Sequence, residues 1–229
     1  MNKFWGVDAD PTAQGRIKGA KPVAVLDIGS NSVRLVVYER HARALTPLYN
    51  EKSSCALGRG VGQTGRLAEA NMAQALNAIK RFALVSRMMR VGKVFILATS
   101  AVRDAANRDE FVSAVENLMQ SSVQVLSGEE EAHYAALGAV AGILGFTGVV
   151  GDLGGGSLEL SAISNGLDTN GQSFELGVIR LQDDSEGSPR KAAETVSARL
   201  KDSCIAEIDK DGSFAAIGGT WRALAKLHQ

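Results

Sequence analysis

The sequence predicts an α/β protein built from two related halves. A phrase of apolar residues, an Asp, a glycine-rich turn and a Ser occurs at residues 23–32 and again, in outline, at residues 149–157. Alternating residues follow each copy, at 33–38 and at 158–163, and a period of two is typical of β-strands. Each copy therefore indicates a strand, a tight turn and a second strand, which differs from a glycine loop that opens a helix.

Further elements of the first half follow from hydrophobic periodicity. Residues 57–65 hold four glycines and are expected to form a loop. The other expected elements are a strand near 44–51, a helix around 72–86, a strand at 93–99, a helix from Ala101 to Met119 and a strand at 123–126.

The second half begins with a long Ala-rich helix. Ser127 and Glu130 have the spacing of a capping box, and the helix is expected to run to about Leu144. After the second hairpin we expect a strand near 172–177, a helix near 189–202, a strand at 213–217 and a helix from about Trp221. Both halves thus repeat a hairpin, a further strand and a helix.

These patterns divide the chain into three parts. Residues 1–21 are expected to be a flexible lead-in, residues 22–127 a first domain and residues 128–229 a second domain. The second half stops just as a helix begins, so we expect that domain to be truncated.

Composition argues against several classes of protein. The sequence has 25 Lys and Arg residues and 25 Asp and Glu residues, so no overall basic field points to DNA. An apolar run of about 18 residues and a signal peptide are both missing, so no membrane association is expected and the location is expected to be cytoplasmic. Cys55 and Cys204 lie far apart in sequence and are expected to be reduced thiols.

The duplicated hairpin is the first candidate for chemistry. Glycines allow backbone N–H groups to converge on an anion, and an Asp at a strand end can hold a metal ion or its water. An ordinary β-turn is the alternative for one copy, but two copies favour a shared role. Two such hairpins could face one another across a cleft and hold a phosphate chain between them.

The residues between the hairpins add an anion contact and a base. Arg103 follows a strand end, where it suits bidentate phosphate binding or is a solvated charge. Gly218, Gly219 and Thr220 close a strand and open a helix, as an anion site or as a turn with a Thr cap.

Glu129, Glu130 and Glu131 occupy the first turn of the Ala-rich helix. Acids there are stabilised by about 0.3–1 kcal/mol each, which accounts for one or two of them. Hydrolysis of a phosphoanhydride needs a carboxylate to orient and deprotonate water, and a third acid is free for that task. Spacing alone does not choose among the three.

Together these motifs resemble the exopolyphosphatase/guanosine pentaphosphate phosphatase family, within the actin/Hsp70/sugar-kinase superfamily. The resemblance runs from about Val23 to the end of the chain. Its motifs, in the family's order, are Asp27–Ser32, Ala98–Arg103, Ser127–Ala132, Asp152–Glu159 and Gly218–Thr220. The resemblance implies two actin-like (ribonuclease H-like) domains of mixed sheet flanked by helices, with a cleft between them and the second domain incomplete.

The resemblance also implies roles for these residues. Glu131 would be the catalytic base, and Asp152 and Glu159 would hold Mg²⁺, or another divalent cation, with the attacking water. His133 stands where the family usually has an Arg. The residues implied to bind substrate phosphate are Asp27, Ser30, Asn31, Ser32, Arg103, Gly154, Gly155, Gly156, Ser157, Gly218, Gly219 and Thr220.

The function implied by the resemblance is Mg²⁺-dependent removal of the terminal phosphate of inorganic polyphosphate. Hydrolysis of the 5′-phosphate of guanosine pentaphosphate is the first alternative. A regulator that binds polyphosphate or guanosine penta- or tetraphosphate without turnover is the second, and an actin-like kinase is the third. The expected partners are these anions and, in a homodimer, a second copy of the chain.

Overall fold

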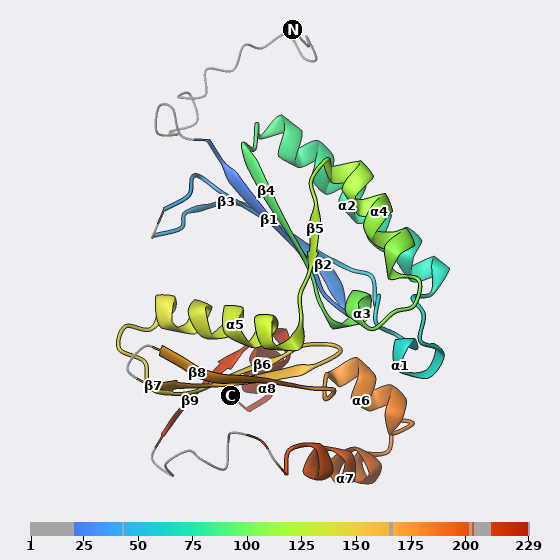
Figure 1. Cartoon of the computed structure of the whole chain (residues 1–229), viewed down its shortest axis with the longest axis vertical. Helices are drawn as coiled ribbons and strands as arrows, with labels where there is room; N and C mark the ends of the chain where they lie inside the picture. The colour runs from blue at the N-terminus through green and yellow to red at the C-terminus, as the bar shows by residue number, and fades with distance from the viewer. Residues whose placement is uncertain (1–20, 43, 165–166, 202, 204–211, 229) are drawn as a thin grey trace, which may run out of the picture.

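The computed structural model describes residues 21–228 except 43, 165–166, 202 and 204–211. Residues 1–20 of the expected lead-in and Cys204 lie outside the described residues. The described part forms two lobes, one above the other in Figure 1, and the chain passes from lobe I to lobe II between β5 (Val123–Val125) and α5 (Gly128–Gly142). The expected boundary between residues 127 and 128 lies next to this crossing.

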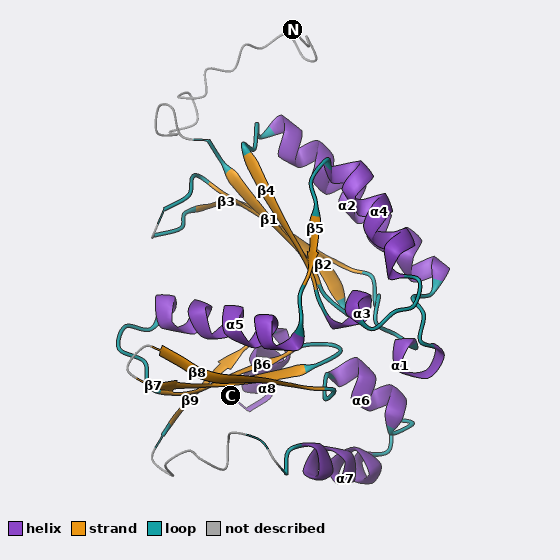
Figure 2. Cartoon of the chain, in the orientation of Figure 1, coloured by secondary structure: helices purple, strands orange, loops and turns teal. Residues whose placement is uncertain are grey.

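Lobe I contains a five-stranded mixed sheet with the strand order β3-β2-β1-β4-β5. Strands β1, β2 and β3 are antiparallel neighbours, and β4 and β5 run parallel to β1. Helices α2 and α4 cover one face of this sheet (Figure 2). The elements are β1 (Val23–Ile28), β2 (Ser32–Tyr38), β3 (Pro47–Ser54), α1 (Val61–Thr64), α2 (Glu69–Met88), β4 (Lys93–Ala98), α3 (Ser100–Arg103), α4 (Arg108–Met119) and β5 (Val123–Val125).

Alternation in the first hairpin places the core of lobe I. Leu26 and Ile28 point to one face of the sheet and are fully buried, whereas Asp27 points to the other face. Ile79 and Phe82 of α2 belong to the same buried cluster as the two strand residues. The apolar positions therefore lie beneath the helices, and the Asp remains free to face lobe II.

Lobe II contains a four-stranded sheet with the order β8-β7-β6-β9. Helix α5 packs across β6, β7 and β8, while α8 lies on the opposite side of the sheet (Figure 1). The elements are α5 (Gly128–Gly142), β6 (Gly148–Leu153), β7 (Leu158–Ser164), β8 (Leu167–Phe174), α6 (Val178–Asp184), α7 (Pro189–Arg199), β9 (Ser213–Ile217) and α8 (Gly219–His228).

The two hairpins have the same backbone pattern, as the duplicated phrase predicts. The N–H of Gly29 donates to the carbonyl of Ser32 at 3.0 Å, and the N–H of Gly154 donates to the carbonyl of Ser157 at 3.0 Å. In each lobe the first hairpin strand also pairs in parallel with a later strand, β4 or β9. The predicted α/β fold of two related lobes is confirmed.

Several expected elements have different bounds. The helix expected from Ala101 to Met119 is two helices, α3 and α4, separated by residues 104–107. Buried Asn107 explains the break, because its side chain accepts from the N–H of Leu67 at 2.8 Å and donates to the Leu67 carbonyl at 3.1 Å. These bonds tie the segment to a distant loop instead of to the next helical turn.

The bounds of some short strands and helices also differ from those that local sequence patterns predict. Strands expected near 44–51 and 172–177 are β3 (Pro47–Ser54) and β8 (Leu167–Phe174). The glycine-rich loop contains the short α1, and α6 was not expected. The last helix begins at Gly219 instead of Trp221.

Polar contacts join the lobes beside α6. Arg180 of α6 forms ion pairs with Asp104 of lobe I and with its own neighbour Glu175. The N–H of Gly60 donates to the Asp183 carboxylate at 3.0 Å. Among the described residues, no helix combines the length and the apolar content needed to cross a membrane.

Candidate active site

A cleft of about 900 Å³ lies between the lobes, and both hairpins line it. The tips of the two turns approach closely, since a Cβ on Gly155 would lie 3.1 Å from the Cβ of Ser30. The expected pair of facing hairpins is therefore present, and their tips pack together. The predicted site residues that line the cleft are Asp27, Ser30, Asn31, Ser32, Glu131, Asp152, Gly154, Gly155, Ser157, Glu159, Gly218, Gly219 and Thr220.

Two rows of side chains, one from each lobe, run across the strands that line the cleft. In lobe I the row is Asp27, Arg34 and Lys52, which are register partners on β1, β2 and β3. In lobe II the equivalent row is Asp152, Glu159 and Ser173, on β6, β7 and β8. Register partners share one face of a sheet, so each row is a contiguous strip. We call these strips the lobe I row and the lobe II row.

The lobe II row holds two carboxylates in a protein-enclosed setting. Glu159 is only 5% exposed, and the hydroxyl of Ser173 donates to its carboxylate at 2.8 Å. Burial raises the pKa of both Asp152 and Glu159 above the ordinary values, and hydrogen bonds from Ser157 and Ser173 oppose part of that shift in Glu159. A bound cation would relieve the cost of these two adjacent negative charges.

The structure distinguishes the three glutamates in the first turn of α5. Glu130 completes the predicted capping box, since its carboxylate accepts from the N–H of Ser127 at 2.8 Å. Glu129 is exposed and lines a second cavity. Glu131 lines the cleft, with a side chain that is 10% exposed. Of the three, only Glu131 faces the lobe II row.

Glu131 holds its proton more tightly than an ordinary glutamate. Burial and the neighbouring charge of Glu159 raise its pKa to about 8, although the guanidinium of Arg103 opposes this shift. Asp27 still touches the water of the cleft, but the surrounding protein and the charge of Asp152 raise its pKa to about 6. The cleft thus contains four carboxylates that favour protonation or cation binding.

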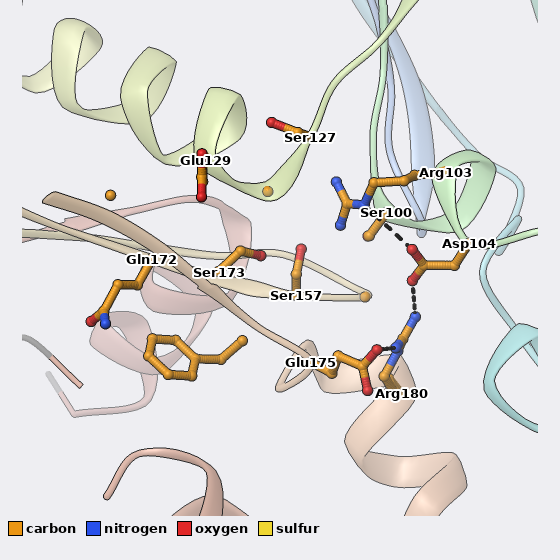
Figure 3. A pocket seen from close by; sticks show the side chains of 14 residues that line it. Ser100, Arg103, Asp104, Ser127, Glu129, Ser157, Gln172, Ser173, Glu175 and Arg180 are labelled. Carbon is orange, nitrogen blue, oxygen red and sulfur yellow. Dashed lines mark hydrogen bonds and ion pairs between the residues drawn. The ribbon is translucent and has the colours of Figure 1, made fainter. Parts of the chain in front are cut away.

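Arg103 and Gly156 do not line the cleft but belong to the adjoining cavity of about 660 Å³ (Figure 3). Arg103 donates to the carboxylate of Glu131 and, at 2.9 Å, to the carbonyl of Leu126. Figure 3 shows Arg103 and Arg180 converging on Asp104. Arg103 therefore contacts Glu131 from behind, and its expected phosphate contact remains a prediction.

The two cavities adjoin at a constriction, which is formed by Ser30, Ser100, Gly156 and Ser157. The hydroxyls of Ser30 and Ser100 are hydrogen-bonded at 2.9 Å. A Cβ on Gly156 would lie 2.4 Å from the Ser100 hydroxyl and 2.6 Å from that of Ser30, so only glycine fits there. Close packing of the turn against lobe I thus depends on this glycine.

Sequence reasoning missed six polar residues of the site. Five of them line the cleft, namely Arg34, Lys52, Thr99, Ser100 and Arg222, and the sixth, Ser173, contacts Glu159. Arg34 was visible as an alternate position after the first hairpin. Thr99 and Ser100 lie within the Ala98–Arg103 motif. Lys52, Arg222 and Ser173 depend on strand register or on helix placement, which a single sequence does not give. His133 is exposed on α5 and is not among the residues that line the cleft.

The donor set fits a hard divalent cation held mainly by substrate and water. Asp152 and Glu159 are register partners on neighbouring strands, so their carboxylates can share one ion. Within the described ranges, no group of three or more His, Cys, Asp or Glu side chains is placed to hold a metal. Mg²⁺ commonly uses one or two carboxylates together with phosphate oxygens and water, which agrees with this pair.

The comparisons with known proteins agree on one family. A profile of the Ppx/GppA phosphatase family matches residues 36–227. Exopolyphosphatase 2 of Mycobacterium tuberculosis is 34% identical over 171 residues, which are 69% of this chain and 53% of that protein. Exopolyphosphatase 1 of the same organism is 30% identical over 221 residues, which are 90% of this chain and 63% of that protein. The chain thus spans between half and two thirds of the length of these relatives.

Solved structures show the same fold. A Ppx/GppA family member from Aquifex aeolicus has a TM-score of 0.72 and 27% identity, with 91% of this chain and 69% of that chain covered. An exopolyphosphatase from Cytophaga hutchinsonii has a TM-score of 0.77 and 25% identity, with 90% and 70% covered. The expected fold is confirmed, and this chain covers about 70% of each of these structures.

Proposed function

Because the chain belongs to the Ppx/GppA phosphatase family, we propose that it is an exopolyphosphatase that removes the terminal phosphate of inorganic polyphosphate. The observation that carries the proposal is the position of Glu131. It lies in the same cleft as Asp152 and Glu159, and both glycine turns line that cleft. The residues proposed as the base, as cation ligands and as the anion-binding turns therefore line one cavity.

The proposed reaction needs few protein groups. A water molecule attacks the terminal phosphorus, its proton passes to the Glu131 carboxylate, and the bridging P–O bond breaks. The products are orthophosphate and a chain shorter by one phosphate. Mg²⁺ bound by Asp152 and Glu159 would neutralise phosphate charge and lower the pKa of water. The chain's own residues position the water and hold the phosphate oxygens.

Donors for the phosphate come from both lobes. The turns at residues 29–32 and 154–157 carry backbone N–H groups and serine hydroxyls that can meet the equatorial oxygens, where negative charge increases in the transition state. Gly219 and Thr220 begin the ten-residue helix α8, whose positive end also faces the cleft. We assign the contacts to the terminal phosphate to the two turns.

Polyphosphate is favoured over guanosine pentaphosphate by the lining of the cleft. The apolar residues among the described lining are Leu153, Val178, Ile217 and Ala223, and none of the described lining residues is aromatic. A guanine base would find no ring on which to stack. The relatives are likewise named as exopolyphosphatases.

A side-by-side assay tests the proposal. Orthophosphate release is measured from long-chain polyphosphate and from guanosine pentaphosphate, with Mg²⁺ and with excess chelator. We expect Mg²⁺-dependent release from polyphosphate at the higher kcat/KM. Release from guanosine pentaphosphate alone would favour the nucleotide phosphatase, binding of either anion without release would favour a regulator, and release that requires a nucleotide and an acceptor would favour a kinase.

Two further expectations belong to this proposal. The free, buried thiol of Cys55 is compatible with a reducing compartment, and we propose a cytoplasmic location. We also propose a homodimer, which light scattering of the purified protein tests directly.

A further inference from the structure

The geometry points to a second phosphate-binding subsite, formed by Arg34, Lys52 and Arg222, that holds internal phosphates of the substrate chain. The three side chains line the cleft and come from β2, β3 and α8. This inference rests on the proposed exopolyphosphatase function, because it assigns the part of the substrate that trails behind the scissile phosphate.

The two rows differ in charge although they occupy equivalent positions. Arg34 is the register partner of Asp27, just as Glu159 is the register partner of Asp152. Lys52 then stands where lobe II has Ser173. The lobe I row therefore carries two cations and one carboxylate, whereas the lobe II row carries two carboxylates and no cation. One wall suits a metal ion, and the other wall suits an anion.

The order of charges along the cleft places the cations away from the base. Asp27 and Asp152 interact electrostatically, so they mark the middle, where the two rows meet. Glu159 and Glu131 interact in the same way, which places Glu131 beyond Glu159. The backbone of Lys52 is two strands from Asp27 in the opposite direction, or about 10 Å at the usual spacing of about 4.8 Å between strands. Its long side chain extends back toward the middle, because its charge, like that of Arg34, opposes the rise in the pKa of Asp27. Lys52 and Arg34 therefore lie on the lobe I side of the Asp27–Asp152 pair, and Glu131 lies on the lobe II side of it, beyond Glu159.

Lys52 reaches from lobe I to the start of α8 in lobe II. Its ammonium nitrogen lies 3.9 Å from the position of a Cβ on Gly219. In the described part of the chain, no carboxylate lies within ion-pair distance of Lys52. A cation beside the positive end of a helix is unfavourable by itself, and an anion between the two would be attracted by both.

Arg222 adds a third positive charge on the same side. It lies one turn into α8, where its Nε donates to the carbonyl of Gly218 at 3.2 Å. That bond holds the guanidinium beside the first turn of the helix. An extended phosphate chain carries about one negative charge per internal unit, so one chain can meet all three cations in succession.

Substitution of Lys52 by Met tests the subsite, because it removes the charge and keeps the length of the side chain. The matched control is Lys80→Met, a change at an exposed lysine on α2. Dissociation constants are measured for labelled long-chain polyphosphate and for tripolyphosphate, across a range of salt concentrations. Melting temperatures of all variants are compared with that of the unchanged protein to verify folding.

We expect Lys52→Met to weaken binding of the long chain about 5- to 20-fold and to lower the slope of log Kd against log salt by about one. The ratio of the long-chain Kd to the tripolyphosphate Kd should rise, because the short anion reaches fewer of the cations. Lys52→Arg should restore most of the affinity, and Arg222→Met should act in the same direction as Lys52→Met.

The outcomes separate this inference from the function on which it rests. If the unchanged protein binds long-chain polyphosphate and Lys52→Met binds it as well as Lys80→Met does, the subsite is wrong and the proposed function stands. Equal weakening for both anions also rejects the subsite as a site for internal phosphates. If the unchanged protein binds neither anion, the proposed function itself fails.

Discussion

Arg103 and Glu131 form a hydrogen-bonded ion pair between α3 of lobe I and the first turn of α5. The pair orients the Glu131 carboxylate from behind, on the side away from the cleft, and it also lowers the free-energy cost of ionising a buried acid. The base and its guanidinium partner thus come from different lobes.

Glu131→Gln is expected to lower kcat for phosphate release by about 10²- to 10⁴-fold, because an amide cannot accept the proton of the attacking water. Binding of polyphosphate, measured separately, should change far less. Glu130→Gln is the matched control, since a glutamine at that position preserves the capping box. Near-normal turnover by Glu131→Gln would show that another group is the base.

Phosphate release should increase with pH through about 8. Glu131 must be ionised to accept a proton, its pKa is raised to about 8, and so the active fraction is small below that pH and complete above it. Arg103→Met removes a charge that lowers this pKa, and the midpoint of the pH–rate profile should move upward. A midpoint that moved downward in Arg103→Met would contradict the assigned ion pair.

The same shift has a consequence for stability. The pKa of Glu131 is near 4.5 in an unfolded chain and about 8 in the folded protein, so the folded state binds more protons between these values. Stability contributed by this group is therefore fully present below about pH 4.5 and falls as the pH rises to about 8. Melting curves of the protein and of Glu131→Gln should diverge over this interval, with the variant losing less stability toward high pH.

Ser173→Ala is expected to raise the Mg²⁺ concentration needed for half-maximal activity by about 3- to 10-fold. The hydroxyl donates to Glu159 at 2.8 Å, and without it the carboxylate loses one of the groups that hold it in place. Ser173→Thr, which keeps a hydroxyl, should recover most of the loss. Binding of Mn²⁺ followed by electron paramagnetic resonance gives a measurement independent of turnover, and an unchanged metal affinity would refute this positioning role.

Gly177→Ala should destabilise the protein by more than about 2 kcal/mol. A Cβ there would lie 2.3 Å from backbone atoms of Gly155 and Gly156, which cannot move without distorting the turn. Gly138→Ala is the contrasting change, since it lies in α5 and its Cβ would meet nothing within 4 Å. That variant should be more stable by about 0.5–1 kcal/mol, as determined by urea denaturation.

Local sequence signals were sufficient for much of the fold. The hairpins were predictable because the period-two pattern and the glycine turns agree, and the capping box because both of its side chains lie within one helical turn. Asn107 is an example of a residue whose structural effect local signals do not predict. It breaks an apparently continuous helix through two hydrogen bonds to Leu67, a residue 40 positions away. No local pattern contains that partner.

The residues of the candidate site also divide into those that local motifs predict and those that depend on strand register. Glu131, Asp152 and Glu159 were named from motifs, and the structure brings them to one cleft. Lys52 and Ser173 reach the rows only through strand register, on β3 and β8, the two strands whose bounds were expected at shifted positions. A shift of one residue would turn either side chain to the other face, so their part in the site was not predictable.

Gly155 links the turn at residues 154–157, which lines the cleft, to the polar contacts between the lobes. Its carbonyl accepts from the N–H groups of Ile179 and Arg180, which fixes the turn at residues 154–157 to the first turn of α6. Arg180 in turn holds Asp104 of lobe I. If the turn binds an anion, as proposed, any change in the mutual orientation of the lobes that accompanies binding would in turn alter the anion affinity by the same free energy.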